Sequence, residues 1–384
     1  MKLIKKASVL LSILIFCITA TACSDKSWAI KSDSETLSTG VYVFYLMQSY
    51  QEAYQKLDQE GKSTSDLSSE KIDDQSAPNW IVDKALNRCK DWIAVEKMFK
   101  EMNLSFSDEE TTKANETTDS SWETYGSTYE KNFGISRNDF HNAVTMFNLK
   151  LDKIFQATYG KDGTNAVSDD EINDFYKANY VSINFYSKMP YEETDTGESE
   201  ENNNSETENK TESENTQENS ENKENNTESD SEKKKADTDE SIQKEFGDYV
   251  EAINSGSQTI DQIRETIKKN EGITDDNDPL VSQVINQNST SLSSEVSDAV
   301  KKLEPGKATY IKFNDVYLLL IKSSTPTETP DLGKDDERKN ILYDMKYNDF
   351  EQKLKDKVSE TKYDINYTAV NQYNPLMFSK LITA

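Results

Sequence analysis

Residues 167–190 change their hydrophobic period part-way along, and this change constrains the fold more than any other feature of the sequence. Ser168 and Glu171 have the three-residue spacing of a capping box, which predicts that a helix begins there. From Tyr180 onward, apolar and polar side chains alternate through residue 187, and this two-residue repeat predicts a half-buried strand. The chain therefore contains both helix and strand, and we expect a mostly helical α+β protein.

The N-terminus has the pattern of a bacterial export signal. Basic residues precede an apolar run at residues 7–18, which is short for a membrane span. The sequence Ala-Thr-Ala-Cys that ends at Cys23 resembles the lipobox of bacterial lipoproteins, where cleavage leaves the cysteine as a lipid-bearing N-terminus. We expect a signal peptide at residues 1–22, a tether at 23–27, and a mature chain lipid-anchored to the outer face of the bacterial cell membrane. The alternative is an ordinary signal peptide in which Cys23 is incidental.

Cysteine, charge and histidine content exclude several classes of function. Only Cys89 remains once Cys17 leaves with the signal and Cys23 carries lipid, so the mature chain forms no internal disulfide and no cysteine metal site. A net charge of -27 disfavours nucleic acid as a partner. His141 is the single histidine and lacks a Ser, Cys or Asp constellation, so we assign it no catalytic role. We expect no metal and no cofactor.

The front of the chain is rich in helical spacing and in aromatic side chains. Apolar residues recur three or four positions apart in 43–57, 80–99 and 135–155, which predicts several amphipathic helices. A similar stripe follows in residues 335–360. These rings have two interpretations, core packing or the lining of a groove for apolar segments of unfolded chains. The candidates for a peptide contact are Tyr50, Tyr54, Phe147, Phe155 and Phe350.

Residues 192–241 contain nineteen acidic residues against five lysines, no aromatic residue and almost no aliphatic one. Such a composition buries too little surface to offset the entropy of ordering, so we expect a disordered acidic insertion. A solvated spacer is one interpretation, and a loose cation-collecting or wall-directed tract is the other. The insertion begins just after the strand that ends near residue 187 and stops before a helix, which places it inside one domain.

The back of the chain alternates helices with strands. Helical spacing recurs in residues 242–253, 260–267 and 292–303, and the last of these helices ends at Pro305. Two strands then flank Asn314 and Asp315, a turn pair typical of a hairpin.

The order of these elements resembles the parvulin-type domain of PrsA and SurA foldases. Residues 293–323 look like that family's final helix, Pro-Gly turn and last two strands, and Gly134-Ile135-Ser136 with residues 167–172 look like its N-terminal chaperone domain. The resemblance implies a helical chaperone domain at 28–179, a parvulin-like α/β domain at 180–325 that carries the insertion at 192–241, and a C-terminal helix and strand at 331–375 that complete the first domain.

The resemblance also implies a prolyl-isomerase site with one histidine on the first strand and another on the last. The matching positions in this chain are approximately Phe185 and Tyr317, so both histidines are absent. We therefore assign no catalytic residue and expect a degenerate parvulin-like domain. Isomerisation needs no covalent chemistry, so the loss of the histidines weakens the case for catalysis without excluding slow activity.

Three functions follow from these observations. The first is a membrane-anchored extracytoplasmic chaperone or foldase that binds unfolded exported polypeptides and lacks efficient isomerase activity. The second is an active peptidyl-prolyl cis-trans isomerase. The third is a surface-assembly interaction lipoprotein. The sequence names neither the client proteins nor the oligomeric state.

Overall fold

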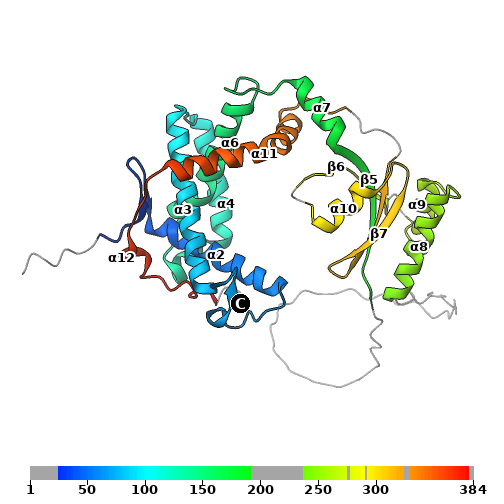
Figure 1. Cartoon of the computed structure of the whole chain (residues 1–384), viewed down its shortest axis with the longest axis horizontal. Coiled ribbons are helices and arrows are strands. Elements are labelled where there is room, and N and C mark those ends of the chain that lie inside the picture. Colours follow the sequence, from blue (N-terminus) through cyan, green and yellow to red (C-terminus); the bar gives the residue numbers. More distant parts are fainter. Residues whose placement is uncertain (1–24, 192–236, 275–276, 290–291, 324–328, 380–384) are drawn as a thin grey trace, which may run out of the picture. The chain divides into compact units, whose positions relative to one another are not determined.

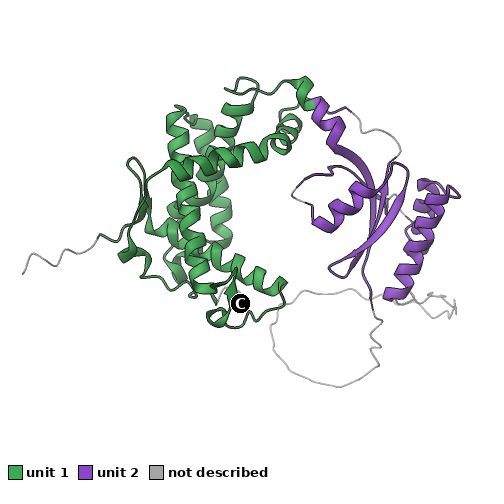
Figure 2. Ribbon diagram, viewed as in Figure 1, with its two compact units in different colours: residues 1–172, 331–384 green, residues 173–330 purple. Residues whose placement is uncertain are grey.

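A computed structural model describes residues 25–191, 237–274, 277–289, 292–323 and 329–379. The predictions for residues 1–22, for Cys23 and for most of the insertion at 192–241 lie outside these residues. The chain divides into two compact units, which are described here one at a time (Figure 2). Unit 1 comprises residues 1–172 and 331–384, and unit 2 comprises residues 173–330.

Unit 1 is built mainly from five long helices (Figure 1). They are α2 (Thr39–Gln59), α3 (Ala77–Glu101), α4 (Asp108–Phe133), α6 (Phe147–Tyr159) and α11 (Asp335–Glu360). Shorter helical segments connect them: η1 (Leu67–Ser69), α5 (Arg137–Phe140), the π-helix η2 (His141–Met146) and α12 (Tyr367–Val370). A capping box formed by Ser107 and Glu110 begins α4.

Helix α2 forms the centre of the unit 1 core. All residues from Val41 to Met47 are buried, so this helix is surrounded by protein for two full turns. Its rings pack edge-on against aromatic neighbours, with Phe44 5.6 Å from Phe140 and 6.1 Å from Tyr129 between ring centroids. Cys89 is fully buried in the same core, and its burial raises the pKa of the thiol, so it is an inert packing residue.

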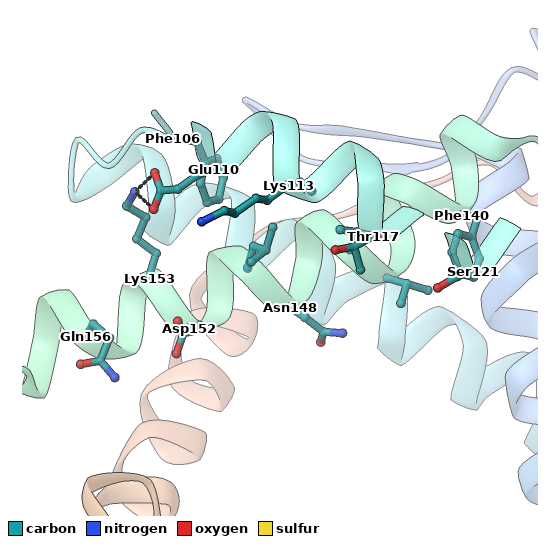
Figure 3. Close-up of a pocket in the computed structure, with 14 residues that line it drawn as sticks. Phe106, Glu110, Lys113, Thr117, Ser121, Phe140, Asn148, Asp152, Lys153 and Gln156 are labelled. Carbon is teal, nitrogen blue, oxygen red and sulfur yellow. Dashed lines mark hydrogen bonds and ion pairs between the residues drawn. The ribbon is translucent and has the colours of Figure 1, made fainter. Parts of the chain in front are cut away.

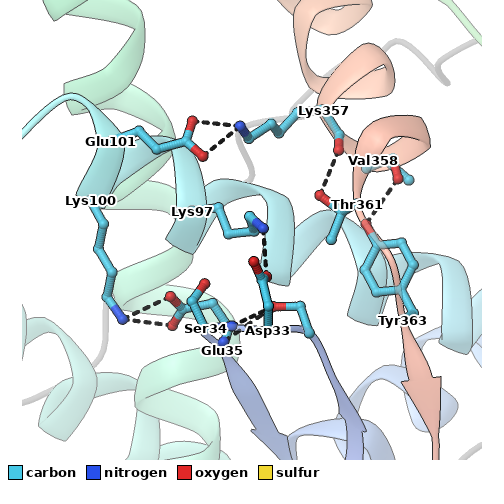
Figure 4. A network of polar contacts seen from close by, with 11 residues as sticks. Asp33, Ser34, Glu35, Lys97, Lys100, Glu101, Lys357, Val358, Thr361 and Tyr363 are labelled. Atoms are coloured by element: carbon cyan, nitrogen blue, oxygen red, sulfur yellow. Dashed lines mark hydrogen bonds and ion pairs between the residues drawn. The ribbon is translucent and has the colours of Figure 1, made fainter.

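A small antiparallel sheet joins the two ends of unit 1, with the order β2-β1-β9. Its strands are β1 (Trp28–Lys31), β2 (Thr36–Ser38) and β9 (Asp364–Ile365), and a separate hairpin pairs β3 (Lys71–Ile72) with β4 (Gln75–Ser76). Polar contacts hold the sheet and α11 against α3 (Figure 4). Lys100 bridges to Glu35 at 2.8 Å on the β1-β2 turn, and Lys357 of α11 bridges to Glu101.

Unit 2 contains a four-stranded antiparallel sheet with the order β6-β5-β8-β7. Helix α7 (Asp169–Asn179) leads into the sheet from unit 1. The strands are β5 (Tyr180–Lys188), β6 (Val281–Asn286), β7 (Ala308–Phe313) and β8 (Val316–Lys322), and the helices are α8 (Asp239–Ser255), α9 (Ile260–Glu271) and α10 (Ser294–Lys302). The predicted change from helix to strand at Tyr180 is confirmed. The predicted hairpin is confirmed too, because Asn314 and Asp315 both have positive φ, as a type I′ turn requires.

The sheet separates two apolar layers. On one face, Phe246, Ile263 and Leu319 belong to a well-filled cluster that α8 and α9 cover. On the other face, α10 covers a thin cluster whose buried members are Ile183, Val300, Leu303 and Leu320. Since side chains alternate along a strand, each face needs its own cover, and the second face has only one short helix.

A charged cluster closes the end of the sheet where the insertion begins and ends. Lys188 of β5 lies 3.1 Å from Asp237, 3.0 Å from Glu245 and 2.8 Å from Glu271, and its side chain is largely buried. Burial alone lowers the pKa of Lys188, but its hydrogen bonds to the three carboxylates outweigh burial and raise it. Beside the cluster, a bridge pairs Tyr191 with Asp237, so the two ends of the acidic segment meet.

The architecture is the mostly helical α+β fold that the sequence predicts. Among the described residues, every helix is too short or too polar to cross a bilayer.

Candidate functional site

A cleft with a volume of about 530 Å³ lies between α4 and α6 in unit 1 (Figure 3). Its floor is apolar, and its rim carries alcohols, amides and charged groups. The apolar lining residues are Phe106, Ala114, Phe140, Val144 and Leu149. The polar lining residues are Glu110, Lys113, Thr117, Ser121, Thr145, Asn148, Asp152, Lys153 and Gln156.

One end of the cleft is fixed by an ion pair between its two walls. Lys153 of α6 lies 2.7 Å from both carboxylate oxygens of Glu110, the same residue that caps α4 (Figure 3). The Lys153 ammonium also lies 5.0 Å from the centre of the Phe106 ring. The hydrogen bond from Lys153 is the largest of the effects that lower the pKa of Glu110, so the Glu110 carboxylate stays charged at neutral pH.

The π-helix η2 lies behind the floor of the cleft, where hydrogen bonds link it to α4. Thr118 of α4 donates its hydroxyl proton to the Ala114 carbonyl at 2.9 Å. It therefore accepts at 2.8 Å from Thr145 and at 2.8 Å from Nδ1 of His141. Burial, followed by the charge of Arg137, lowers the pKa of His141, which stays neutral at pH 7 and links η2 to α4. The single histidine thus has a packing role behind the cleft.

Three of the five predicted peptide-contact residues lie in the core. Tyr50 is 3% exposed, Phe155 is 0% exposed and Phe350 is 6% exposed. Phe155 stacks on Tyr343 with ring centroids 4.0 Å apart, and Phe350 packs edge-on against it at 5.3 Å. The three rings are enclosed by protein in this structure and none of them lines the cleft, so their contact with a client stays a prediction.

The other two candidates are partly accessible, and neither lines the cleft. Tyr54 packs on the outside of the α2 core. Phe147 lines a smaller cavity of about 230 Å³ together with Arg88 and Asp91. Sequence reasoning placed Phe140 and Val144 on a core stripe and did not single out Leu149 or Phe106. Phe140 and Val144 both line the cleft and pack in the unit 1 core, so the stripe itself carried no signal for the cleft.

A second apolar cavity, of about 180 Å³, lies in unit 2 between the sheet and α10. We call it the groove. None of its lining side chains titrates, and all but one are apolar: Ile183, Phe185, Gln283, Ile285, Leu292, Val296, Val300, Leu318 and Leu320. Such a surface can bind an apolar side chain, but it holds no group for general acid or base catalysis.

The two positions assigned to the missing histidines lie on opposite faces of the sheet. Phe185 pairs with Leu320 across β5 and β8, whereas Lys188 pairs with Tyr317. The three-residue offset is odd, so Phe185 faces the groove while Tyr317 is buried against α8, where it hydrogen-bonds Asp239. Leu318, the neighbour of Tyr317 in β8, lines the groove on the same face as Phe185.

In the part of the chain that the structure describes, no three His, Cys, Asp or Glu side chains are grouped so as to hold a metal ion.

Comparisons with known proteins return the kind of protein that the sequence resembles. Family models and curated proteins give no match. Solved structures that match include the foldase PrsA from Lactococcus lactis, with 12% identity, a TM-score of 0.31, and coverage of 92% of this chain and 98% of that one. PrsA from Streptococcus pneumoniae has 11% identity, a TM-score of 0.31, and coverage of 77% and 88%.

A further match is to the SurA-like chaperones of Campylobacter jejuni, PEB4 and Cj1289. It has 13% identity, a TM-score of 0.25, and coverage of 88% of this chain and 99% of that one. Because these identities and TM-scores are low, the roles of residues in this chain are inferred from the contacts that they make in its own structure.

Proposed function

We propose that this chain is a lipid-anchored, extracytoplasmic chaperone or foldase that holds apolar segments of unfolded exported polypeptides in the cleft of unit 1. The observation that carries the proposal is the cleft itself, which is open to solvent, about 530 Å³ in volume and apolar at its floor. That volume lies in the range of small-ligand sites and accommodates several apolar side chains of one segment.

The lining of the cleft favours binding over chemistry. It contains no Cys or His, and its Lys153 and Glu110 are already paired with each other. Thr117 and Asn148 are exposed at the rim, where they can bond the main chain of a bound segment whatever its side chains are (Figure 3). An apolar floor with sequence-tolerant polar partners suits a site that accepts many clients.

A binding assay with one variant and one matched control tests this proposal. Leu149→Gln replaces a cleft-floor side chain, and Tyr125→Gln makes a comparable change at a ring on α4 that is 54% exposed and does not line the cleft. We expect Leu149→Gln to weaken the binding of an unfolded apolar test protein about tenfold and to reduce its protection from aggregation. Tyr125→Gln should change neither. Wild-type protein that neither binds nor protects the test protein contradicts the proposal.

Anchoring through Cys23 is a separate part of the proposal. Its support is the export signal followed at once by a lipobox-like sequence, which predicts lipid on the outer face of the membrane. Mass spectrometry of the mature N-terminus tests it directly. Wild-type protein should carry lipid at Cys23, and Cys23→Ala should be released from membranes; an unlipidated wild type contradicts anchoring.

The last part of the proposal concerns isomerase activity in unit 2. We propose that it lacks efficient activity, because no titratable group lines the groove. One observation favours the alternative of an active prolyl isomerase, namely the apolar groove beside Phe185, since a twisted imide needs only a fitting apolar surface.

Turnover of a short X-Pro peptide separates the two alternatives. The variant Phe185→Ser opens the groove, and Tyr317→Phe is the control because its side chain lies on the opposite face of the sheet. We expect no significant turnover by wild type. Turnover that Phe185→Ser abolishes and Tyr317→Phe leaves intact establishes the isomerase. A protein with neither turnover nor protection from aggregation fits a surface-assembly lipoprotein.

A further inference from the structure

Strand β6 forms one edge of the unit 2 sheet and is unusually exposed. Four of its six residues are exposed, and two of them are valines, Val281 and Val284, each 46% exposed. Among the described residues, β6 has a strand partner on one side only, which is β5.

This edge lacks the features that normally prevent edge-to-edge pairing. Natural sheets protect an exposed edge with charged side chains, proline or a bulge. The sequence of β6, Val-Ser-Gln-Val-Ile-Asn, contains no charge and no proline, and its register with β5 runs without a shift from Asn286 to Val281. Strand β6 is thus an edge without a charge or a bulge in a chain of net charge -27, and we expect such an edge to have a binding function.

The register fixes which main-chain groups point outward. The amide of Gln287 donates to Asn179 of the neighbouring chain segment, and Ser323 donates to Ser182 on the β8 side. In an antiparallel ladder, bonded and non-bonded pairs alternate, so Gln283 and Ile285 bond β5 whereas Ser282 and Val284 do not. The N–H and C=O groups of Ser282 and Val284 therefore face the open edge.

The side chains of β6 also alternate, between the groove face and the opposite face of the sheet. Gln283 and Ile285 line the groove, beside Phe185 and Ile183 of β5. A segment that adds to β6 as a fifth strand would place every second side chain next to this apolar lining, and its main chain would bond Ser282 and Val284.

The occupant that fits is an extended, uncharged segment of an unfolded polypeptide. A second copy of this chain fits poorly, because a six-residue edge is about 20 Å long and covers roughly 200 Å², against about 800 Å² per partner in a stable complex. The acidic segment at 192–241 of the same chain fits poorly as well, since it has almost no apolar side chain to place in the groove.

We infer that unit 2 captures client polypeptides by β-augmentation at β6, with alternate apolar side chains of the client lying over the groove. This inference rests on the proposed chaperone function and adds to it a second binding surface, with a main-chain mode of recognition that is independent of acid or base groups.

The first test changes one main-chain donor of the protein. Val284→Pro removes an outward N–H without breaking a bond to β5, and Val284→Thr is the control that keeps the N–H. The probe is an uncharged ten-residue peptide in which Val and Thr alternate. We expect Val284→Pro to weaken its binding about fivefold or more and Val284→Thr to leave it within about twofold. Equal binding by all three proteins overturns the inference.

The second test uses wild-type protein, so it does not depend on the folding of a variant. Two forms of the peptide are N-methylated either at every valine or at every threonine. In a strand with valines over the groove, only one of the two sets donates to β6, the threonines if the strand is antiparallel and the valines if it is parallel. We expect one form to bind and the other to fail. Equal binding, or equal loss, overturns the inference.

Two further readouts separate the other outcomes. Sedimentation of wild type and Val284→Pro detects a dimer that depends on the edge, and such a dimer would replace the client with a second copy and overturn the inference. Protection of the unfolded test protein is measured in the same preparations. If wild type protects it through the unit 1 cleft while the β6 variants bind the peptide normally, the inference fails and the proposed function stands.

Discussion

The cleft of unit 1 and the groove of unit 2 are both apolar, but they arise in different ways. The cleft is a gap between α4 and α6. Its two walls are joined at one end by the Glu110–Lys153 ion pair, and a continuous core around α2 supports them. The groove exists because α10 is too short to cover one face of a sheet. A gap between helices is bounded by side chains alone, whereas an incompletely covered sheet also offers an open edge.

This difference separates the two modes of binding. Under the two proposals, a client in the cleft would be held by apolar side chains and a polar rim. A client at β6 would be held through its main chain, and its side chains would only select the face. The cores behind the two sites also differ, and this makes them separately measurable, because all four tryptophans, Trp28, Trp80, Trp92 and Trp122, belong to unit 1.

The largest effect should come from Phe155→Ala in unit 1. Removing a fully buried ring that stacks on Tyr343 should lower the free energy of unfolding by about 3–5 kcal/mol. Urea denaturation followed by tryptophan fluorescence measures it. Tyr347→Ala, at a ring of α11 that is 47% exposed, is the control and should cost less than about 0.5 kcal/mol. A stable Phe155→Ala variant that has lost peptide binding would restore this ring as a ligand contact.

Lys188→Met should have the largest effect in unit 2. The change leaves Asp237, Glu245 and Glu271 together without their cation, which should destabilise the unit by about 3 kcal/mol. Hydrogen exchange in β5 and β8 measures it, since tryptophan fluorescence reports unit 1. The control Lys312→Met breaks a pair between Lys312 and Asp239 that is well exposed, and it should cost less than about 1 kcal/mol. Equal effects of both variants would show that the cluster is not a stabilising centre.

Lys322→Met should stabilise unit 2 by roughly 1 kcal/mol at pH 7. Lys322 is a buried residue at the end of β8; its ammonium reaches the Val300 carbonyl at 3.3 Å, and burial lowers its pKa. The unfolded chain therefore binds this proton more tightly, so wild-type stability should rise with pH between the lowered pKa and about 10.5. The gain in Lys322→Met should shrink over the same window. A gain that is constant with pH would assign the effect to packing.

The smallest effect should come from His141. Its pKa is lowered by burial and by Arg137 and Lys150, against the opposing charge of Asp119. The unfolded chain then binds more protons below pH 6.5, so the stability of unit 1 should fall on acidification from pH 7 to 5, by less than about 1 kcal/mol. Fluorescence-detected denaturation of His141→Asn should lack this component. An unchanged pH dependence would show that other groups set it.

Several parts of the fold were fixed by local sequence. The capping box of Ser168 with Glu171 forms as predicted, because a cap involves only one turn of helix. The turn at Asn314-Asp315 and the strand beginning at Tyr180 could also be predicted from the local sequence, since positive φ and a two-residue repeat are properties of a few neighbouring residues.

Other elements gave no such signal. Strand β6 was not predicted, because an exposed edge strand has no buried face and so no hydrophobic alternation. The stripe at 135–155 predicted one long helix, whereas the π-turn at His141–Met146 interrupts it. His141, the first residue of this π-helix, hydrogen-bonds Thr118 of α4, a contact that the local sequence pattern does not reveal.

The sequence by itself determined where the helices and most strands begin and that the chain is a mostly helical α+β protein. Only the tertiary structure decided which rings are core and which surfaces are open. Phe155 and Val144 belong to the same predicted stripe, yet Phe155 is enclosed by α11 whereas Val144 is only partly buried and lines the cleft. Phe185 and Tyr317 face opposite ways because the strand register pairs Phe185 with Leu320, 135 positions further along the chain. Local preference sets an element, but burial and facing depend on partners that the element meets only after the chain folds.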